Sequence, residues 1–191
     1  MVLDVFELHG ADGRDDRQQG SGKTLAFVLP ILDRLYRQLD AQRTVQGVKA
    51  LILCPTRELA QQVEKHVLAI TRMKFRIRCI LLIGGISLEK QRRLLAKAPD
   101  VIIATPGRLW HWIDEEKAAY LHQHQDSLQF LVIDEVDRML QSGHFAELDH
   151  RFHFIRNRSP SNLQTMVFSA TLAHAALLRK LLLKSRTESE A

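Results

Sequence analysis

The chain has 191 residues, with 27 Lys and Arg against 22 Asp and Glu, so its formal net charge is +5. Hydrophobic residues make up 46% and charged residues 26% of the sequence, which argues against a disordered chain and suits one domain with a core of its own. The sequence has no uncharged apolar run approaching about 18 residues, and its first ten residues place acids inside their apolar run. Neither a membrane span nor a secretory signal is expected. The two cysteines lack a CxxC spacing and predict neither a disulfide framework nor a cysteine zinc site, so we expect an intracellular protein. Its positive net charge is compatible with nucleic acid.

Apolar patterning after residue 20 alternates between helical and strand spacing. The segments with helical spacing run from Leu25 to Leu39, from Leu59 to Ile70, from Leu88 to Leu95 and from Leu109 to Ile113, with a last helix over His174–Leu183. The short, nearly continuous apolar runs are Val48–Cys54, Ile77–Ile83, Val101–Ala104, Phe130–Ile133 and Thr165–Phe168. Strands buried on both faces have this pattern, which is typical of parallel sheets. The sequence therefore predicts an α/β fold, with helices on both faces of a mainly parallel sheet and ligands beyond the carboxyl ends of the strands.

A proline and two tryptophans lie inside the predicted helices. Pro30 lies well inside the first helix and should kink or shorten it, because proline has no backbone N–H. Trp110 and Trp112 lie about 200° apart on a helix, so we expect Trp112, with Leu109, in the core.

A glycine-rich loop opens the first long helix with Gly20, Ser21, Gly22, Lys23 and Thr24. Glycines let backbone N–H groups approach phosphate oxygens, and the amino end of a helix adds partial positive charge. The Lys23 ammonium can reach the β- and γ-phosphates of a nucleoside triphosphate, and the Thr24 hydroxyl can ligate Mg²⁺. We therefore predict a triphosphate site, against the alternative of a Gly-rich helix start with a capping Thr.

The segment before this loop departs from the usual pattern. Arg17 stands five positions before Gly22, where a small residue is usual, and Gly10–Gln19 is too charged to be the buried strand from which such a loop hangs. Only Val2–Leu8 could serve as that strand, and about eleven residues would then separate it from the loop.

An acidic cluster follows the apolar run Phe130–Ile133 directly and contains Asp134, Glu135 and Asp137. One carboxylate can hold Mg²⁺ while another accepts a proton, which suits Asp134 as the metal ligand and Glu135 as the group that polarises the attacking water. Alone, such a cluster is more often a helix N-cap. The phosphate loop about 110 positions upstream favours a hydrolysis site.

Several short motifs occur in a fixed order along the chain. They are GSGKT (Gly20–Thr24), PTRELA (Pro55–Ala60), GG (Gly84 and Gly85), TPGR (Thr105–Arg108), DEVD (Asp134–Asp137) and SAT (Ser169–Thr171). In this order the sequence resembles the first RecA-like lobe of DEAD-box RNA helicases from residue 20 to about residue 185. The resemblance implies a three-layer P-loop NTPase domain with ATP and Mg²⁺ as cofactors and RNA as partner. The stretches GHFAEL (Gly143–Leu148) and RLW (Arg108–Trp110) are similar to a subgroup linked to large ribosomal subunit assembly, which implies a nucleolar location and pre-ribosomal protein partners.

The resemblance also implies roles for single residues. The catalytic residues would be Lys23, Asp134 and Glu135, with Gly20 to Thr24 on the phosphates and with Thr24 and Asp134 on the metal. The residues that match contacts to the RNA backbone are Arg57, Gly85, Thr105 and Arg108, and those that match the coupling of ATP state to RNA binding are Asp137, Ser169 and Thr171. Freed amides, hydroxyls at helix starts and Arg forks bind phosphate without reading bases, so no DNA-specific signal is present. Taken singly, Thr56 or Thr105 could equally be an N-cap, Gly84-Gly85 a turn, and Arg57 or Arg108 a solvated charge.

The chain also departs from the family. Val136 stands where the family has Ala, and nothing in the sequence matches the element with which the family reads adenine or the second lobe with its arginine finger. We therefore expect little ATPase activity from this chain alone. The alternatives are a catalytically inactive module that binds RNA or protein, and a small-molecule kinase that would leave PTRELA, TPGR and SAT unexplained. The expected segments are an atypical N-terminal segment (1–19), the ATP-binding domain (20–185) and a frayed tail (186–191).

Overall fold

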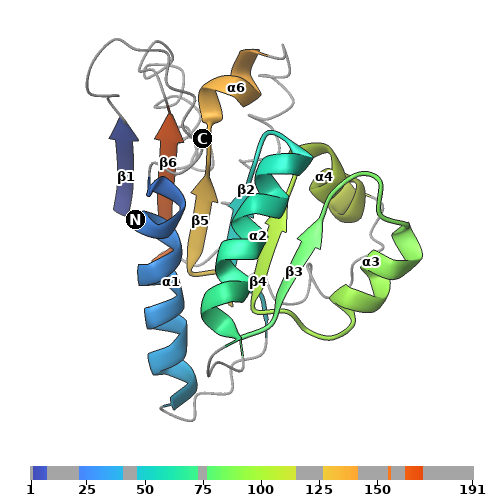
Figure 1. Ribbon diagram of the computed structural model, residues 1–191, viewed down its shortest axis with the longest axis horizontal. Coiled ribbons are helices and arrows are strands. Elements are labelled where there is room, and N and C mark those ends of the chain that lie inside the picture. Colours follow the sequence, from blue (N-terminus) through green and yellow to red (C-terminus); the bar gives the residue numbers. More distant parts are fainter. Residues whose placement is uncertain are drawn as a thin grey trace, which may run out of the picture.

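The computed structural model describes residues 2–7, 22–40, 47–72, 77–114, 127–141, 155 and 162–169 (Figure 1). In chain order they form β1 (Val2–Glu7), α1 (Lys23–Asp40), β2 (Ala50–Leu53), α2 (Arg57–Thr71), β3 (Cys79–Leu82), α3 (Leu88–Leu95), β4 (Val101–Ala104), α4 (Pro106–Asp114), β5 (Phe130–Ile133), α6 (Val136–Gln141) and β6 (Gln164–Ser169). The helix expected over His174–Leu183 lies outside the described residues. None of the described helices combines the length and the apolar character that crossing a bilayer requires.

The strands form one six-stranded sheet in the order β1-β6-β5-β2-β4-β3, and every pairing is parallel. This confirms the predicted strands, and β1 confirms that the apolar run near the amino terminus is a strand, at the edge of the sheet beside β6. Leu53 pairs with Ala104 on one side and with Ile133 on the other, so β2, β4 and β5 end level with one another. The residues that follow these strands therefore emerge at the same edge of the sheet.

Two layers of helices cover the sheet, because alternate residues of each strand face opposite sides. Ala50 and Ile52 face the layer made by α1 and α2, whereas Leu51 and Leu53 face the layer made by α3, α4 and α6 (Figure 1). The structure is thus the predicted three-layer α/β arrangement.

Helix α1 continues through Pro30 from Lys23 to Asp40, so the proline does not shorten the helix, and the alternative effect, a kink, stays a prediction. Pro30 lies on the exposed side of α1, while Phe27, Ile31 and Leu35 on the opposite side are buried against the sheet. The carbonyl that loses its helical donor at the proline belongs to Ala26, an exposed residue, so water can replace the missing hydrogen bond. The ring of Phe27 also packs 5.1 Å from that of Phe168 on β6, which holds the helix on the sheet.

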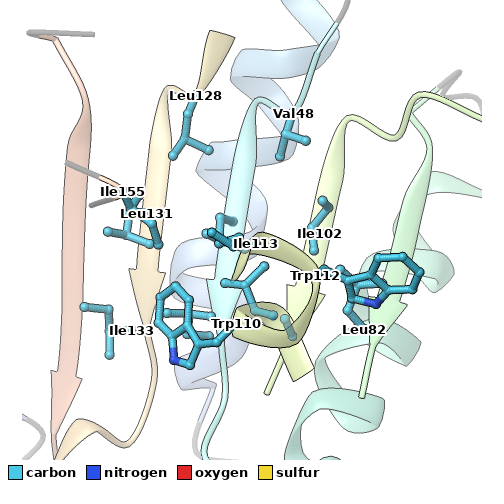
Figure 2. Close-up of a cluster of buried hydrophobic side chains, with 14 of the residues drawn as sticks. Val48, Leu82, Ile102, Trp110, Trp112, Ile113, Leu128, Leu131, Ile133 and Ile155 are labelled. Carbon is cyan, nitrogen blue, oxygen red and sulfur yellow. The ribbon is translucent and has the colours of Figure 1, made fainter. Parts of the chain in front are cut away.

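Both tryptophans of α4 are buried, Trp110 with 2% and Trp112 with 1% of its surface exposed. Figure 2 shows the two indoles on opposite sides of α4, with Trp112 directed towards Leu82 and Trp110 towards Ile133. The expectation for Trp112 is confirmed. Trp110 is buried as well, because α4 lies across the sheet and both of its flanks meet apolar side chains.

Candidate nucleotide and RNA sites

The described residues of the predicted site gather at the carboxyl edge of the sheet. They are Lys23 and Thr24 at the start of α1, Arg57 after β2, Gly85 after β3, Thr105 and Arg108 after β4, Asp134, Glu135 and Asp137 after β5, and Ser169 at the end of β6. Gly20, Ser21 and Thr171 lie outside the described residues. Parallel strands thus bring together motifs that are far apart in the sequence.

The start of α1 has the backbone expected of a phosphate loop. Gly22 has φ +72°, in the left-handed region that side chains disfavour, and its carbonyl accepts the first helical bond from Ala26 N–H at 3.0 Å. Lys23 and Thr24 follow as the first helical residues and are half-buried. Because the first N–H groups of a helix have no acceptor within it, this end of α1 favours an anion.

Asp134 is a buried carboxylate next to other charges. Its backbone N–H donates to the Leu53 carbonyl at 2.9 Å, and only 5% of the residue is exposed. Burial raises the pKa of Asp134 to about 6, repulsion from Glu135 and Asp137 acts in the same direction, and the Glu135 N–H and the Lys23 ammonium oppose it. The influence of Lys23 means that its ammonium lies within electrostatic reach of the Asp134 carboxylate at the carboxyl edge of the sheet.

Glu135 occupies a different environment from Asp134. Its φ of +46° is in the left-handed region, which is uncommon for a residue other than glycine. Its carbonyl accepts bonds from the N–H groups of Arg138 and Met139, and its carboxylate lies 3.2 Å from Arg138 Nη1 with 42% of the side chain exposed. The sharp turn from β5 into α6 therefore directs one acid into the protein and the next towards solvent.

The residues around Asp134 suit Mg²⁺ rather than a metal held by protein ligands alone. Within the stretches that the structure describes, no three His, Cys, Asp or Glu side chains cluster closely enough to hold a metal ion. Mg²⁺ prefers oxygen ligands and keeps several waters and substrate oxygens, so one carboxylate and the Thr24 hydroxyl suffice on the protein side. A cation here would also offset the repulsion between Asp134 and Glu135.

A second feature of this edge is a pocket of about 420 Å³ whose lining is Arg57, Gly84, Thr105, Gly107, Arg108 and His111. A Cβ on Gly84 would lie 2.5 Å from Arg57 Nη2, and one on Gly85 would lie 3.2 Å from Arg57 Nη1, so the glycines leave room for the guanidinium. Two guanidinium groups at one concave surface are suited to phosphate oxygens. The predicted residues Arg57, Thr105 and Arg108 thus share one pocket, with Gly85 beside it.

The sequence did not single out His111 as part of this pocket. His111 follows Arg108 by three residues on α4, a spacing that places two side chains on neighbouring positions of one helix face. The spacing of three residues between Arg108 and His111 could have identified His111 as a neighbour of Arg108. It indicates a pocket residue only once α4 is known to begin at the pocket.

Both helices that start at the pocket have defined first turns. The Thr56 Oγ1 accepts a bond from Leu59 N–H at 3.2 Å, so this threonine is the N-cap of α2. The Thr105 carbonyl accepts bonds from the N–H groups of Arg108 and Leu109, which start α4. These contacts fix the directions in which Arg57 and Arg108 leave their helices.

The described residues predicted to couple the two sites are both buried. Asp137, in the first turn of α6, has 9% of its surface exposed, and Ser169, the last residue of β6, has 2%. Helix α6 packs against β6, so the two residues lie on contacting elements.

The fold and the residues at this edge together define a RecA-like lobe, in which Lys23 at the start of α1 and the acidic cluster after β5 lie at the carboxyl edge of a parallel sheet. The sequence matches the DEAD/DEAH box helicase family over residues 16–178, and the chain belongs to that family. It corresponds to the amino-terminal RecA-like lobe of a DEAD-box helicase.

Individual relatives agree with this assignment. The ATP-dependent RNA helicase mak5 of Schizosaccharomyces pombe is 43% identical over 80% of this chain and 22% of its own length. DEAD-box ATP-dependent RNA helicase 13 of rice is 36% identical over 95% of this chain and 26% of its own length. The chain thus spans about a quarter of the curated relatives it matches.

Solved structures give the same result. The yeast splicing factor Prp28 superimposes with a TM-score of 0.74 at 31% identity, over 94% of this chain and 38% of that one. The DEAD-box helicase Mss116 bound to single-stranded RNA and UDP-BeF superimposes with a TM-score of 0.74 at 28% identity, over 96% of this chain and 34% of that one. The alternative of a catalytically inactive module that binds RNA or protein is not favoured by these similarities.

Proposed function

We propose that this chain binds ATP with Mg²⁺ and single-stranded RNA, and that it couples ATP hydrolysis to RNA strand remodelling when joined to a second lobe. The observation that carries the proposal is the electrostatic interaction between Lys23 and Asp134 at the same sheet edge as the pocket around Arg57. The amides of Gly20 to Thr24 and the Lys23 ammonium hold the phosphates. Thr24 and Asp134 would hold Mg²⁺, which when bound neutralises phosphate charge and favours attack at the γ-phosphorus.

Glu135 is the group that receives a proton from the attacking water. Its side chain is 42% exposed, so it can reach water that enters the site, whereas Asp134 is buried. The different surroundings of the two neighbouring acids therefore suit two different roles.

RNA binding uses the pocket that contains Arg57 and Arg108. Two guanidinium groups, the exposed turn at Gly85 and the start of α4 at Thr105 offer donors to successive backbone phosphates without contacting bases, so binding is independent of base sequence. We propose that Asp137, Ser169 and Thr171 transmit the nucleotide state to this surface.

Thermal unfolding tests the nucleotide part of the proposal. ATP with Mg²⁺ at about 100 times the dissociation constant should stabilise the chain by about 2.7 kcal/mol, and EDTA should abolish the stabilisation. Lys23→Ala should remove the effect, whereas Lys90→Ala, which alters an exposed lysine of α3, should keep it. The absence of any Mg²⁺-dependent stabilisation of the unmodified chain would contradict a formed ATP site.

Fluorescence anisotropy with labelled decauridylate tests the RNA part. Arg57→Ala should weaken binding by about tenfold, because it removes one charge-assisted phosphate contact. The control is Arg72→Ala, which removes an exposed arginine at the other end of α2. Equal losses in the two variants would indicate general charge attraction rather than the pocket.

We further propose that the protein acts on the large ribosomal subunit in the nucleolus, together with pre-ribosomal proteins. The support is the GHFAEL stretch at Gly143–Leu148, which lies outside the described residues, and the similarity to mak5. Imaging of the tagged protein with a nucleolar marker tests this, and an even distribution through the cell would contradict it.

A further inference from the structure

Gln91 is a polar side chain with no solvent exposure, buried in α3 behind the pocket. Its Nε2 donates to the Ile83 carbonyl at 2.6 Å and to the Ile86 carbonyl at 3.3 Å. Its Oε1 accepts a bond from the Trp112 indole Nε1 at 2.8 Å. One amide therefore links three segments of the chain, namely the turn after β3, helix α3 and helix α4.

The segments that this amide links form two walls of the pocket. Ile83 and Ile86 flank the turn at Gly84 and Gly85, against which the Arg57 guanidinium packs. Trp112 belongs to α4, the helix that presents Arg108 and His111 to the same pocket. A shift of Gln91 would thus move the glycine turn relative to the start of α4.

The glycine turn depends on contacts of this kind. Two adjacent glycines allow the backbone many conformations, and Gly85 has φ +86°. The space between Gly84 and Arg57 is so small that a single added carbon would lie 2.5 Å from Nη2. A buried amide that bonds the carbonyls on both sides of the turn restrains its conformation, since breaking the bond to Ile83 would leave a buried carbonyl without its donor.

We infer that Gln91 is a positioning residue for RNA binding: through its bonds to the glycine turn and to Trp112, it sets the spacing between the Arg57 and Arg108 sides of the phosphate pocket. This inference rests on the proposed RNA binding. Gln91 itself does not line the pocket, so it acts through the groups that do.

The test compares Gln91→Met, which keeps the length of the side chain without its hydrogen bonds, with a matched control. The control is Gln129→Met, which removes a reciprocal amide pair with Gln38 (2.7 and 3.0 Å) just before β5, at the opposite edge of the sheet. Labelled decauridylate measures RNA affinity, thermal unfolding measures stability, and the Mg²⁺-ATP shift measures the nucleotide site. Gln91→Met should raise the Kd for decauridylate by about tenfold, the equivalent of one hydrogen bond to a charged group, and retain the Mg²⁺-ATP shift.

The control should lower the unfolding temperature while leaving the Kd within about twofold of the unmodified chain, since a purely structural loss does not alter the affinity of the folded fraction. Hydrogen exchange at residues 84–86 should increase in Gln91→Met and not in Gln129→Met. Unchanged RNA affinity in a folded Gln91→Met protein, or an equal loss in both variants, would overturn the inference.

If Gln91→Met does not fold, Trp112→Phe tests the same inference from the other partner of the hydrogen bond. It removes the indole donor together with part of the buried ring and should raise the Kd by about threefold, and an unchanged Kd in this variant would also overturn the inference. If the unmodified chain binds Mg²⁺-ATP but not decauridylate, the proposed RNA binding fails and the inference fails with it. If the unmodified chain binds RNA and the variants bind equally well, the inference alone fails.

Discussion

Replacing Asp134 with Asn should stabilise the metal-free chain, and the gain should grow with pH. The folded protein raises the pKa of this carboxyl from 3.8 to about 6, mainly by burial. The stability that protonated Asp134 contributes is therefore complete below pH 3.8 and is lost as the pH rises through about 6, whereas Asn does not titrate. A shift of about two pH units corresponds to about 3 kcal/mol, of which about 2 kcal/mol should develop between about pH 4.5 and about pH 7.5.

Urea unfolding in EDTA at several pH values measures this difference. Comparing the unmodified chain with Asp134→Asn at each pH cancels the titration of groups that the substitution leaves alone. The same variant should lose the stabilisation by Mg²⁺-ATP, because the carboxylate that would hold the metal is gone. A stability difference that stays constant with pH, or that falls as the pH rises, would refute the reasoning from burial.

Further predictions concern the pocket and the core. Gly84→Ala should weaken decauridylate binding by about tenfold, because its methyl group would displace the Arg57 guanidinium. Thr56→Ala should lower the free energy of unfolding by about 1 kcal/mol in urea titrations, because α2 loses the acceptor for Leu59 N–H. Val136→Ala should lower the free energy of unfolding by about 1–3 kcal/mol, because Val136, the first residue of α6, is only 1% exposed in the core and the loss of its methyl groups leaves a cavity.

Each of these predictions has its own control. Gly84→Ala should leave the Mg²⁺-ATP shift unchanged, and a reduced shift would indicate wider damage. Thr56→Ser keeps the capping oxygen and should behave like the unmodified chain, so an equal loss in Ser and Ala would exclude the cap as the cause. A gain in stability for Val136→Ala would mean that the valine is overpacked rather than well packed.

The sequence predicted the sheet well because its strands are buried on both faces. Continuous apolar runs marked each of the strands from β2 to β6. The predicted bounds coincide with those of β4 and β5, are wider than those of β2 and β3, and are narrower than those of β6. Val48 and Cys54 are buried just outside β2, so burial continues where strand pairing stops. Pro30 does not end α1, because buried apolar residues on the opposite side of the helix hold it on the sheet.

The site was predicted from motifs, and its supporting residues were not. Arg57, Thr105 and Arg108 share a pocket as the motifs suggested, because parallel strands bring their ends together. Gln91 gave no signal, since a glutamine in a helix rich in charged residues has the pattern of a solvent-facing position. Its role depends on which side of α3 meets Trp112, and that is decided by packing between segments distant in the sequence.

Because both tryptophans lie in α4, intrinsic fluorescence reports on the packing of this helix against the sheet. The chain has two tryptophans, Trp110 and Trp112, so all indole emission originates from one side of the sheet and from the helix that borders the pocket. Emission therefore follows the loosening of that layer, while circular dichroism averages over all helices. Comparing the two signals during denaturation would show whether the α4 layer separates before the remainder of the lobe or together with it.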